Sequence, residues 1–339
     1  MKKRKINIIF ISFVCLMACT AKLTEIIADV VTETTLHDTD DPAIWINKQD
    51  PSKSIIFGTD KDEVNGGIYA FNIDGKIIKN KCLNKISYPN NVDIEYGFAL
   101  TDSTETDILV FSEREKYQIR LFSVPDMKPL DNGGFKVFED ETSNDMKRPM
   151  GVSLYKNPEN GSIQVIVSRK VGPTENYLYQ YEFVSDSLGV KTKLVREFGT
   201  FSGQKEIEAI AVDDASGYVY YSDEGVGIRK YHANPEKGNQ ELTVFGGEYF
   251  KDDIEGISIA KYEDKGFLIV SNQQAHTFNI FDLKTNVFVK ELNLGTIETD
   301  GCDVTATALG DKFPNGLFVS MNDEKNFFYH DLSKLKLLE

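Results

Sequence analysis

The sequence is poor in the residues that build zinc sites and disulfide frameworks. Only 4 cysteines and 4 histidines occur among 339 residues, and no Cys-x-x-Cys or Cys/His zinc spacing is present. Downstream of Cys19 only Cys82 and Cys302 remain, and their spacing does not tell whether they pair. The residues therefore support neither a zinc-organised domain nor a disulfide scaffold, and the fold has to rest on an ordinary apolar core.

Positive charge is also in short supply. The chain has 38 Lys and Arg against 53 Asp and Glu, a formal net charge of −15. A surface this acidic does not attract nucleic acid or anionic lipid by electrostatics, and it suits metal cations better. An anionic substrate would need a local cationic or metal-filled patch to overcome the overall field.

The N-terminus contains an apolar run, but this run is shorter than a membrane-spanning helix requires. Lys2, Lys3, Arg4 and Lys5 precede the apolar segment 6–16, and Met17-Ala18-Cys19 follow it directly. This pattern is typical of a bacterial lipoprotein, with a signal peptide over 1–18, lipidation of Cys19 and an anchor or linker over 19–25. We expect a cell-envelope protein, an outer-membrane lipoprotein or a secreted one, that touches the membrane only through this anchor; an ordinary secretory signal with an incidental cysteine is the alternative.

The remaining chain, 26–339, consists largely of short runs of β-branched and aromatic residues and shows little helical periodicity. Three kinds of strand recur in the same order six times, about 50 residues apart, which is the period of a four-stranded propeller blade. The sequence therefore predicts an all-β, six-bladed β-propeller. The segment Ile26 to Thr35 precedes the first repeat, and we expect it to close the ring by pairing with the last blade.

In such a fold the starts of the first strands and the ends of the second strands gather at one mouth of the central channel. Carboxylates dominate these positions and are the candidate metal ligands: Asp40, Asp41, Asp93, Glu208, Glu224, Asp253, Glu255, Asp300 and Asp303. Hard oxygen donors in this number favour several calcium ions. Basic residues occupy the equivalent ends in the early blades and are the candidate phosphate-binding residues: Lys61, Arg114, Arg169 and Lys170.

Two segments carry a family resemblance. Asp40-Asp41-Pro42-Ala43-Ile44-Trp45 and Asn90-Asn91-Val92-Asp93-Ile94 resemble signature segments of the β-propeller phytases, and later acidic segments follow in the same order. The resemblance implies a calcium-dependent, 3-phytase-like phosphatase that acts, as a monomer, on phytate or a similar phosphorylated small molecule. It implies as catalytic residues Lys61, Arg114, Lys170, Glu208 and Glu224. Three positions depart from the family pattern: Asp62 replaces a lysine, Glu95 an arginine and Met150 a tyrosine.

The mechanism predicted from the residues is direct attack by a metal-activated water. No Arg-His-Gly motif and no cysteine followed six positions later by arginine is present to form a covalent phosphoenzyme. Two alternatives stay open. One is a calcium propeller that hydrolyses lactones or esters, and the other is a binding module in which calcium is only structural.

Overall fold

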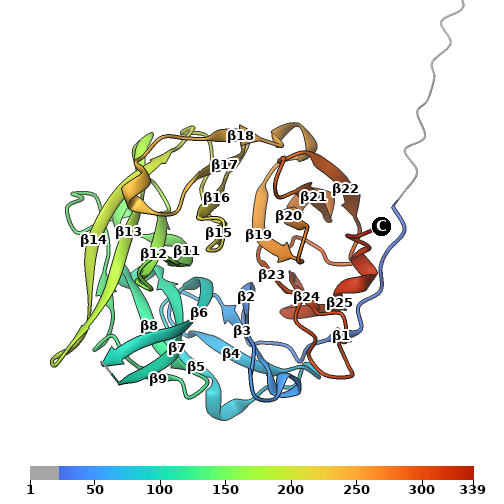
Figure 1. The fold of residues 1–339 in the computed structure, drawn as a ribbon, viewed down its shortest axis with the longest axis horizontal. Helices are drawn as coiled ribbons and strands as arrows, with labels where there is room; N and C mark the ends of the chain where they lie inside the picture. Colours follow the sequence, from blue (N-terminus) through green and yellow to red (C-terminus); the bar gives the residue numbers. More distant parts are fainter. Residues whose placement is uncertain (1–22, 102) are drawn as a thin grey trace, which may run out of the picture.

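The computed structural model describes residues 23–101 and 103–339, so the predicted signal peptide and Cys19 lie outside the described residues. Six antiparallel sheets stand around a central axis as the blades of a propeller (Figure 1). This confirms the predicted six-bladed, all-β architecture.

Each blade is built from strands that are consecutive in sequence, apart from the outermost strand of blade 6, and the first of the consecutive strands lies innermost. Blade 1 contains β2 (Thr39–Trp45), β3 (Ile55–Asp60), β4 (Gly66–Asn72) and β5 (Leu83–Ile86). Blade 2 contains β6 (Pro89–Thr101), β7 (Thr104–Glu113), β8 (Gln118–Val124), β9 (Lys128–Pro129) and β10 (Phe135–Lys136). Blade 3 contains β11 (Pro149–Lys156), β12 (Ile163–Arg169), β13 (Glu175–Asp186) and β14 (Gly189–Thr200).

The second half of the ring repeats this plan. Blade 4 contains β15 (Ile210–Asp213), β16 (Tyr218–Asp223), β17 (Gly227–His232) and β18 (Thr243–Phe245). Blade 5 contains β19 (Ile254–Lys261), β20 (Gly266–Asn272), β21 (Thr277–Asp282) and β22 (Phe288–Leu292). Blade 6 contains β23 (Cys302–Thr305), β24 (Leu317–Asn322), β25 (Asn326–Asp331) and, as its outermost strand, β1 (Val30–Val31).

Helical structure among the described residues consists of short 3-10 turns in the connections. These are η1 (Pro51–Lys53), η2 (Lys79–Lys81), η3 (Arg114–Lys116), η4 (Asp145–Lys147), η5 (Pro235–Lys237), η6 (Gly247–Tyr249), η7 (Gln273–Ala275) and η8 (Leu332–Leu335). A search of the same residues finds no helix with the length and apolarity needed to span a bilayer.

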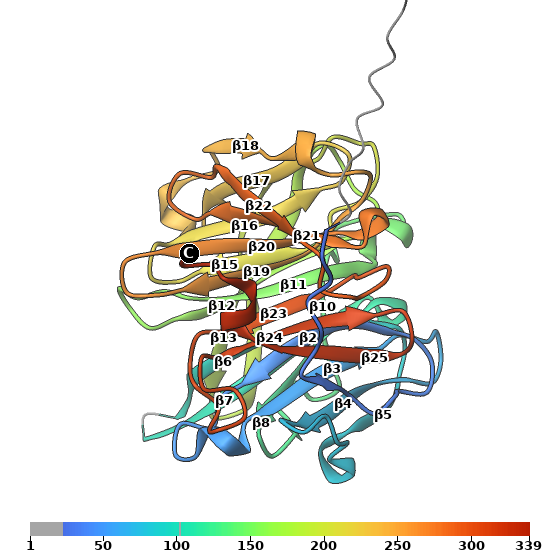
Figure 2. The same cartoon turned by 90° about the vertical axis from the view of Figure 1, so that its right-hand side faces the viewer.

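The N-terminal segment closes the ring as predicted. In β1, Val30 lies opposite Tyr329 and Val31 opposite Phe328 of β25. Figure 2 shows this segment running along the outer rim of the last blades before the chain enters blade 1. Further backbone bonds on either side of β1 run from the amides of Asp29, Thr32 and Thr35 to carbonyls of β25 and the turn before it. The closure therefore covers the free edge that β25 would otherwise expose.

The core is divided among the interfaces between blades. Each neighbouring pair of blades shares one cluster of buried apolar side chains, and the cluster between blades 6 and 1 completes the circle. In that cluster the rings of Phe71 and Phe327 meet edge to face with centroids 5.8 Å apart. Cys82 and Cys302 both have free thiols. The main apolar clusters therefore lie between the blades.

Candidate active site

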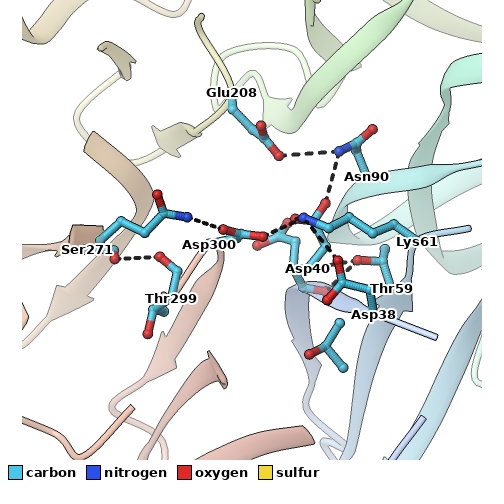
Figure 3. A network of polar contacts seen from close by, with 12 residues as sticks. Asp38, Asp40, Thr59, Lys61, Asn90, Glu208, Ser271, Thr299 and Asp300 are labelled. Atoms are coloured by element: carbon cyan, nitrogen blue, oxygen red, sulfur yellow. Dashed lines mark hydrogen bonds and ion pairs between the residues drawn. The ribbon is translucent and has the colours of Figure 1, made fainter. Parts of the chain in front are cut away.

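The starts of the inner strands converge at one mouth of the axis, where polar side chains from separate blades meet (Figure 3). Asp40 lies near the start of β2, Asn90 near the start of β6 and Glu255 near the start of β19. Glu208 and Asp300 lie in the connections that lead into β15 and β23. Residues far apart in the sequence therefore form one group, which we call the mouth cluster: Asp40, Lys61, Asn90, Glu208, Glu224, Glu255 and Asp300.

Glycine at 301 lets two blades approach closely beneath this cluster. The Gly301 amide donates to the Asp40 carbonyl at 2.9 Å. A Cβ at this position would lie 2.1 Å from Oδ1 of Asp41, a distance no side chain tolerates. The Asp-Gly sequence at 300–301 thus brings Asp300 of blade 6 beside Asp40 of blade 1.

Lys61 provides the positive charge at the centre of the mouth cluster. Its Nζ donates to Oδ1 of Asp40 at 3.0 Å and to Oδ2 of Asp300 at 2.6 Å, and it lies 3.8 Å from Asp38. Burial opposes the charge of Lys61, but the charges of Asp40, Asp300 and Glu208 prevail and raise its pKa well above the ordinary value. Burial likewise opposes the charge of Asp40, yet Lys61 and nearby hydrogen bonds hold the pKa of Asp40 below its usual range.

Two amides missed by the sequence predictions complete these contacts. Asn90 Nδ2 donates to Asp40 at 3.0 Å and to Glu208 at 3.3 Å, while its buried Oδ1 has no hydrogen-bond partner among the described residues. Gln273 Nε2 donates to Oδ1 of Asp300 at 2.5 Å. Gln273 follows the end of β20, as Lys61 follows β3. The equivalent positions of the two residues in the repeat could therefore have identified Gln273 as a site residue.

The other carboxylates of the mouth cluster repel one another. Burial and then the charge of Asp40 raise the pKa of Glu208 to about 7. Burial and then the charge of Glu208 raise the pKa of Glu224 to about 9. Burial also raises the pKa of Glu255 and of Asp300 well above the ordinary values. One ammonium group therefore does not neutralise the cluster, and additional cations would relieve the repulsion.

Asp253 lies at the edge of the mouth cluster in contacts of its own. Its backbone amide donates to Oε1 of Gln274 at 2.7 Å, and its carboxylate accepts from Nε2 of the same side chain at 2.5 Å. Lys205 forms ion pairs with both Asp252 and Asp253. Asp253 is thus already partnered, unlike Glu224 and Glu255.

Three predicted ligands, Asp41, Asp93 and Asp303, lie deeper, around a cavity of ≈ 150 Å³ on the axis. Each carboxylate accepts a backbone amide from the next blade: Asp41 from Val92 at 3.0 Å, Asp93 from Leu154 at 2.7 Å and Asp303 from Ile44 at 2.8 Å. Burial raises the pKa of Asp93 to about 6 and of Asp303 to about 7. These residues tie neighbouring inner strands together and form a group separate from the mouth cluster.

The four predicted phosphate-binding residues differ in their surroundings. Arg114 is 9% exposed and lies close enough to the mouth cluster to lower the pKa of Asp40 and Glu208. Lys170 lies at the rim in an ion pair with Glu206. Arg169 is fully buried, donates to the carbonyls of Tyr177 and Asn176, and pairs with Glu141 at 2.5 Å. The structure does not bring the Arg169 side chain to the mouth cluster, because it packs between blades.

The three departures from the family pattern also separate in space. Asp62 caps a turn by accepting the amides of Val64 and Asn65. Glu95 lies further along β6, where it contributes to raising the pKa of Asp214, and so lies outside the mouth cluster. Met150 contacts a predicted phosphate-binding residue, since its Sδ accepts from Nη2 of Arg114.

Calcium is compatible with the donor set of the mouth cluster. Its side chains offer hard carboxylate and amide oxygens, and one buried amide oxygen, Oδ1 of Asn90, has no partner. Within residues 23–101 and 103–339, no three Asp, Glu, His or Cys side chains are grouped closely enough to hold a metal ion. The cluster therefore supplies oxygen donors of the kind that calcium binds.

Comparison with known proteins identifies the family. A family model described as Phytase matches residues 11–328. The chain belongs to the phytase family. A relative named 3-phytase, from Bacillus subtilis (strain 168), is 32% identical over 302 residues, which cover 84% of this chain and 74% of the relative. This family membership makes the chain a 3-phytase-like phosphatase.

Among solved structures, the WD40 β-propeller domain of Doa1 is similar to this phytase-family chain in fold. The TM-score is 0.53 at 9% sequence identity, with 91% of this chain and 97% of the other covered. At this identity the likeness supports the propeller architecture alone.

Proposed function

We propose that this protein hydrolyses phosphate monoesters of phytate in a calcium-dependent reaction that uses a metal-activated water. The observation that carries the proposal is the mouth cluster, where under-neutralised carboxylates from several blades lie beside Arg114 in a member of the phytase family. Metal-assisted phosphate ester hydrolysis needs carboxylates that bind metal ions and, next to them, a positively charged side chain that binds the phosphate.

Calcium would be held by the four carboxylates whose raised pKa values indicate negative charge without a sufficient counter-charge: Glu208, Glu224, Glu255 and Asp300. Asp40 would assist them while it keeps its bond to Lys61. Further calcium ions would be bound by Asp253 at the rim and by Asp41, Asp93 and Asp303 around the cavity. Bound calcium would supply neutralisation of the phosphate charge and a lower pKa of the attacking water.

The basic residues would bind and orient the phosphate groups. Arg114 presents a guanidinium suited to bidentate contact with a phosphate. Lys170 would reach a phosphate at the rim by exchanging its pairing with Glu206, and Lys61 would do so by exchanging one of its carboxylates. These contacts position the ester and stabilise charge that develops on the phosphoryl oxygens.

The deciding experiment measures phosphate release from phytate by the purified protein, first with calcium, then with a chelator, and finally with calcium restored. We expect activity to disappear on chelation and to return with calcium. Phosphate release that is unaffected by chelation would refute the calcium requirement. Turnover of lactones or esters instead of phytate, or binding without turnover, would favour the other two kinds of calcium propeller.

We further propose that the enzyme is a monomer anchored in the cell envelope through a lipid on Cys19. The N-terminal sequence pattern supports the lipid anchor, and the several acyl chains of a processed lipoprotein hold a protein stably at a membrane. Replacing Cys19 by alanine should move the protein from the membrane fraction to the soluble fraction with unchanged kinetics. A variant that stays in the membrane fraction would contradict the lipid anchor.

A further inference from the structure

Arg114 differs from the other predicted phosphate-binding residues in having no acidic partner. Lys61 pairs with Asp40 and Asp300, Lys170 with Glu206, and Arg169 with Glu141. Within residues 23–101 and 103–339 no carboxylate lies within ion-pair distance of the Arg114 guanidinium, although the side chain is only 9% exposed. A buried cation without a counter-charge is unfavourable unless its ligand supplies one.

Two uncharged side chains hold this guanidinium. Its Cζ lies 4.0 Å from the centroid of the Tyr88 ring, and its Nη2 donates to Sδ of Met150 at 2.8 Å. A π face and a thioether attract a cation without cancelling its charge. The Nε of Arg114 is buried and finds no hydrogen-bond partner in the part of the chain that the structure describes. The guanidinium is therefore oriented, and neither its charge nor its Nε donor is matched by a partner among the described residues.

The backbone of Tyr88 is held in an unusual conformation. Its φ is +56°, in the left-handed region that a bulky residue rarely adopts. The Tyr88 amide donates to the Asp62 carbonyl at 2.8 Å, and the Tyr88 carbonyl accepts the Arg114 amide at 3.1 Å. These two bonds fix the residue between blades 1 and 2. Strained residues of this kind persist where the surrounding structure enforces them, which is common at ligand sites.

We propose that Tyr88 is a positioning residue that keeps Arg114 aimed and unpaired for a phosphate group, with Met150 as its second support. The inference rests on the proposed phosphate-binding role of Arg114 and deepens it. Since Tyr88 acts through Arg114, its loss should weaken phosphate binding more than it slows the chemical step.

The test compares Tyr88→Ala, Tyr88→Phe and Tyr117→Ala with the wild type at saturating calcium. Tyr117 is a matched control, because it is also a left-handed tyrosine and follows Arg114 by three residues, yet does not stack on it. We expect Tyr88→Ala to raise the KM for phytate and the Ki for inorganic phosphate in parallel, about 5- to 30-fold, with a smaller fall in kcat. Tyr88→Phe keeps the ring and should stay within about twofold of wild type, as should Tyr117→Ala.

A double-mutant cycle tests whether Tyr88 acts through Arg114. Once Arg114 is alanine, Tyr88→Ala should cause no further loss. Calorimetric titration with inorganic phosphate gives the same comparison without turnover, and equal melting temperatures with calcium would show that the variants are folded.

The outcomes separate the two proposals. If Arg114→Ala impairs phosphate binding but Tyr88→Ala does not, the positioning role is wrong and the proposed function stands. Wild-type behaviour of Arg114→Ala would overturn both. An equal loss in Tyr88→Phe and Tyr88→Ala would assign the effect to the hydroxyl group and overturn the stacking argument.

Discussion

Glu208 offers a sharp test of the electrostatic description of the mouth cluster. Its pKa is raised to about 7, first by burial and then by Asp40. An acid whose folded pKa lies above its unfolded pKa loses stability as pH rises between the two values. Without metal, charged Glu208 should therefore destabilise the fold above about pH 7, and a neutral glutamine at this position should not.

The expected size of the effect follows from the shift. A change from the ordinary 4.5 to about 7 corresponds to roughly 3 kcal/mol at pH 8, since one pKa unit is about 1.4 kcal/mol. This figure is an upper bound, because Glu208 is partly exposed and its partners share the repulsion. Glutamine keeps an oxygen that can accept from Nδ2 of Asn90, so the 3.3 Å hydrogen bond survives. We expect Glu208→Gln to melt up to about 5 °C above the wild type in chelator at pH 8.

The assay is thermal unfolding with chelator and with calcium, at pH 8 and near pH 4. Near pH 4 wild-type Glu208 is protonated in both states, so the two proteins should have nearly the same stability. With calcium the order should reverse at pH 8, because the variant has lost a ligand carboxylate and gains less from the ion. Glu206→Gln, two residues earlier in the same connection, is the matched control and should shift stability by no more than about 1 kcal/mol.

A metal-free Glu208→Gln protein that is no more stable than wild type at pH 8 would refute the reasoning. It would mean that Glu208 carries no unrelieved charge. The calcium assignment would then lose its main structural support.

Three further predictions concern Glu224, Lys61 and the ring closure by β1. Because burial and then Glu208 raise the pKa of Glu224 to about 9, calcium should raise the melting temperature more at pH 8 than at pH 5; an equal increase at both would contradict its role as a ligand. Lys61→Met leaves two carboxylates without their cation and should lower metal-free stability by about 3–5 kcal/mol in denaturant unfolding, partly restored by calcium; a loss under about 1 kcal/mol would contradict the central ion pair. A chain that begins at His37 lacks β1 and should aggregate, as light scattering would show, whereas one that begins at Leu23 should not; a soluble, active protein from His37 would argue against the closure.

The repeat pattern was sufficient to predict the propeller because every blade depends on the same local features. Short alternating strands and polar strand ends recur about 50 residues apart, and a sheet that cannot bury both faces alone has to pack against copies of itself. The closure by β1 was predictable for a related reason: Ile26 to Thr35 was the one strand-like segment left without a blade, and blade 6 had an edge to cover.

The depth of each acidic residue along the axis could not be predicted in the same way. Asp40 and Asp41 are adjacent, yet one contacts Lys61 and the other binds the amide of Val92 in the next blade. In a strand, neighbouring side chains leave on opposite sides, but which of the two reaches the mouth depends on the irregular register between residues 39 and 42. Sequence alone assigned both the same role.

Arg169 and Arg114 show the same limit for the basic residues. Both end or follow a second strand of a blade, and composition gives no reason to separate them. Arg169 turns into the packing between blades, where the rings of Phe138 and Tyr179 and two backbone carbonyls enclose it. Arg114 meets one ring and one sulfur and keeps a free donor. An arginine at this position can therefore bind a substrate only if the neighbouring blades do not already provide acceptors for all its donors. Which acceptors they provide is a property of the assembled ring.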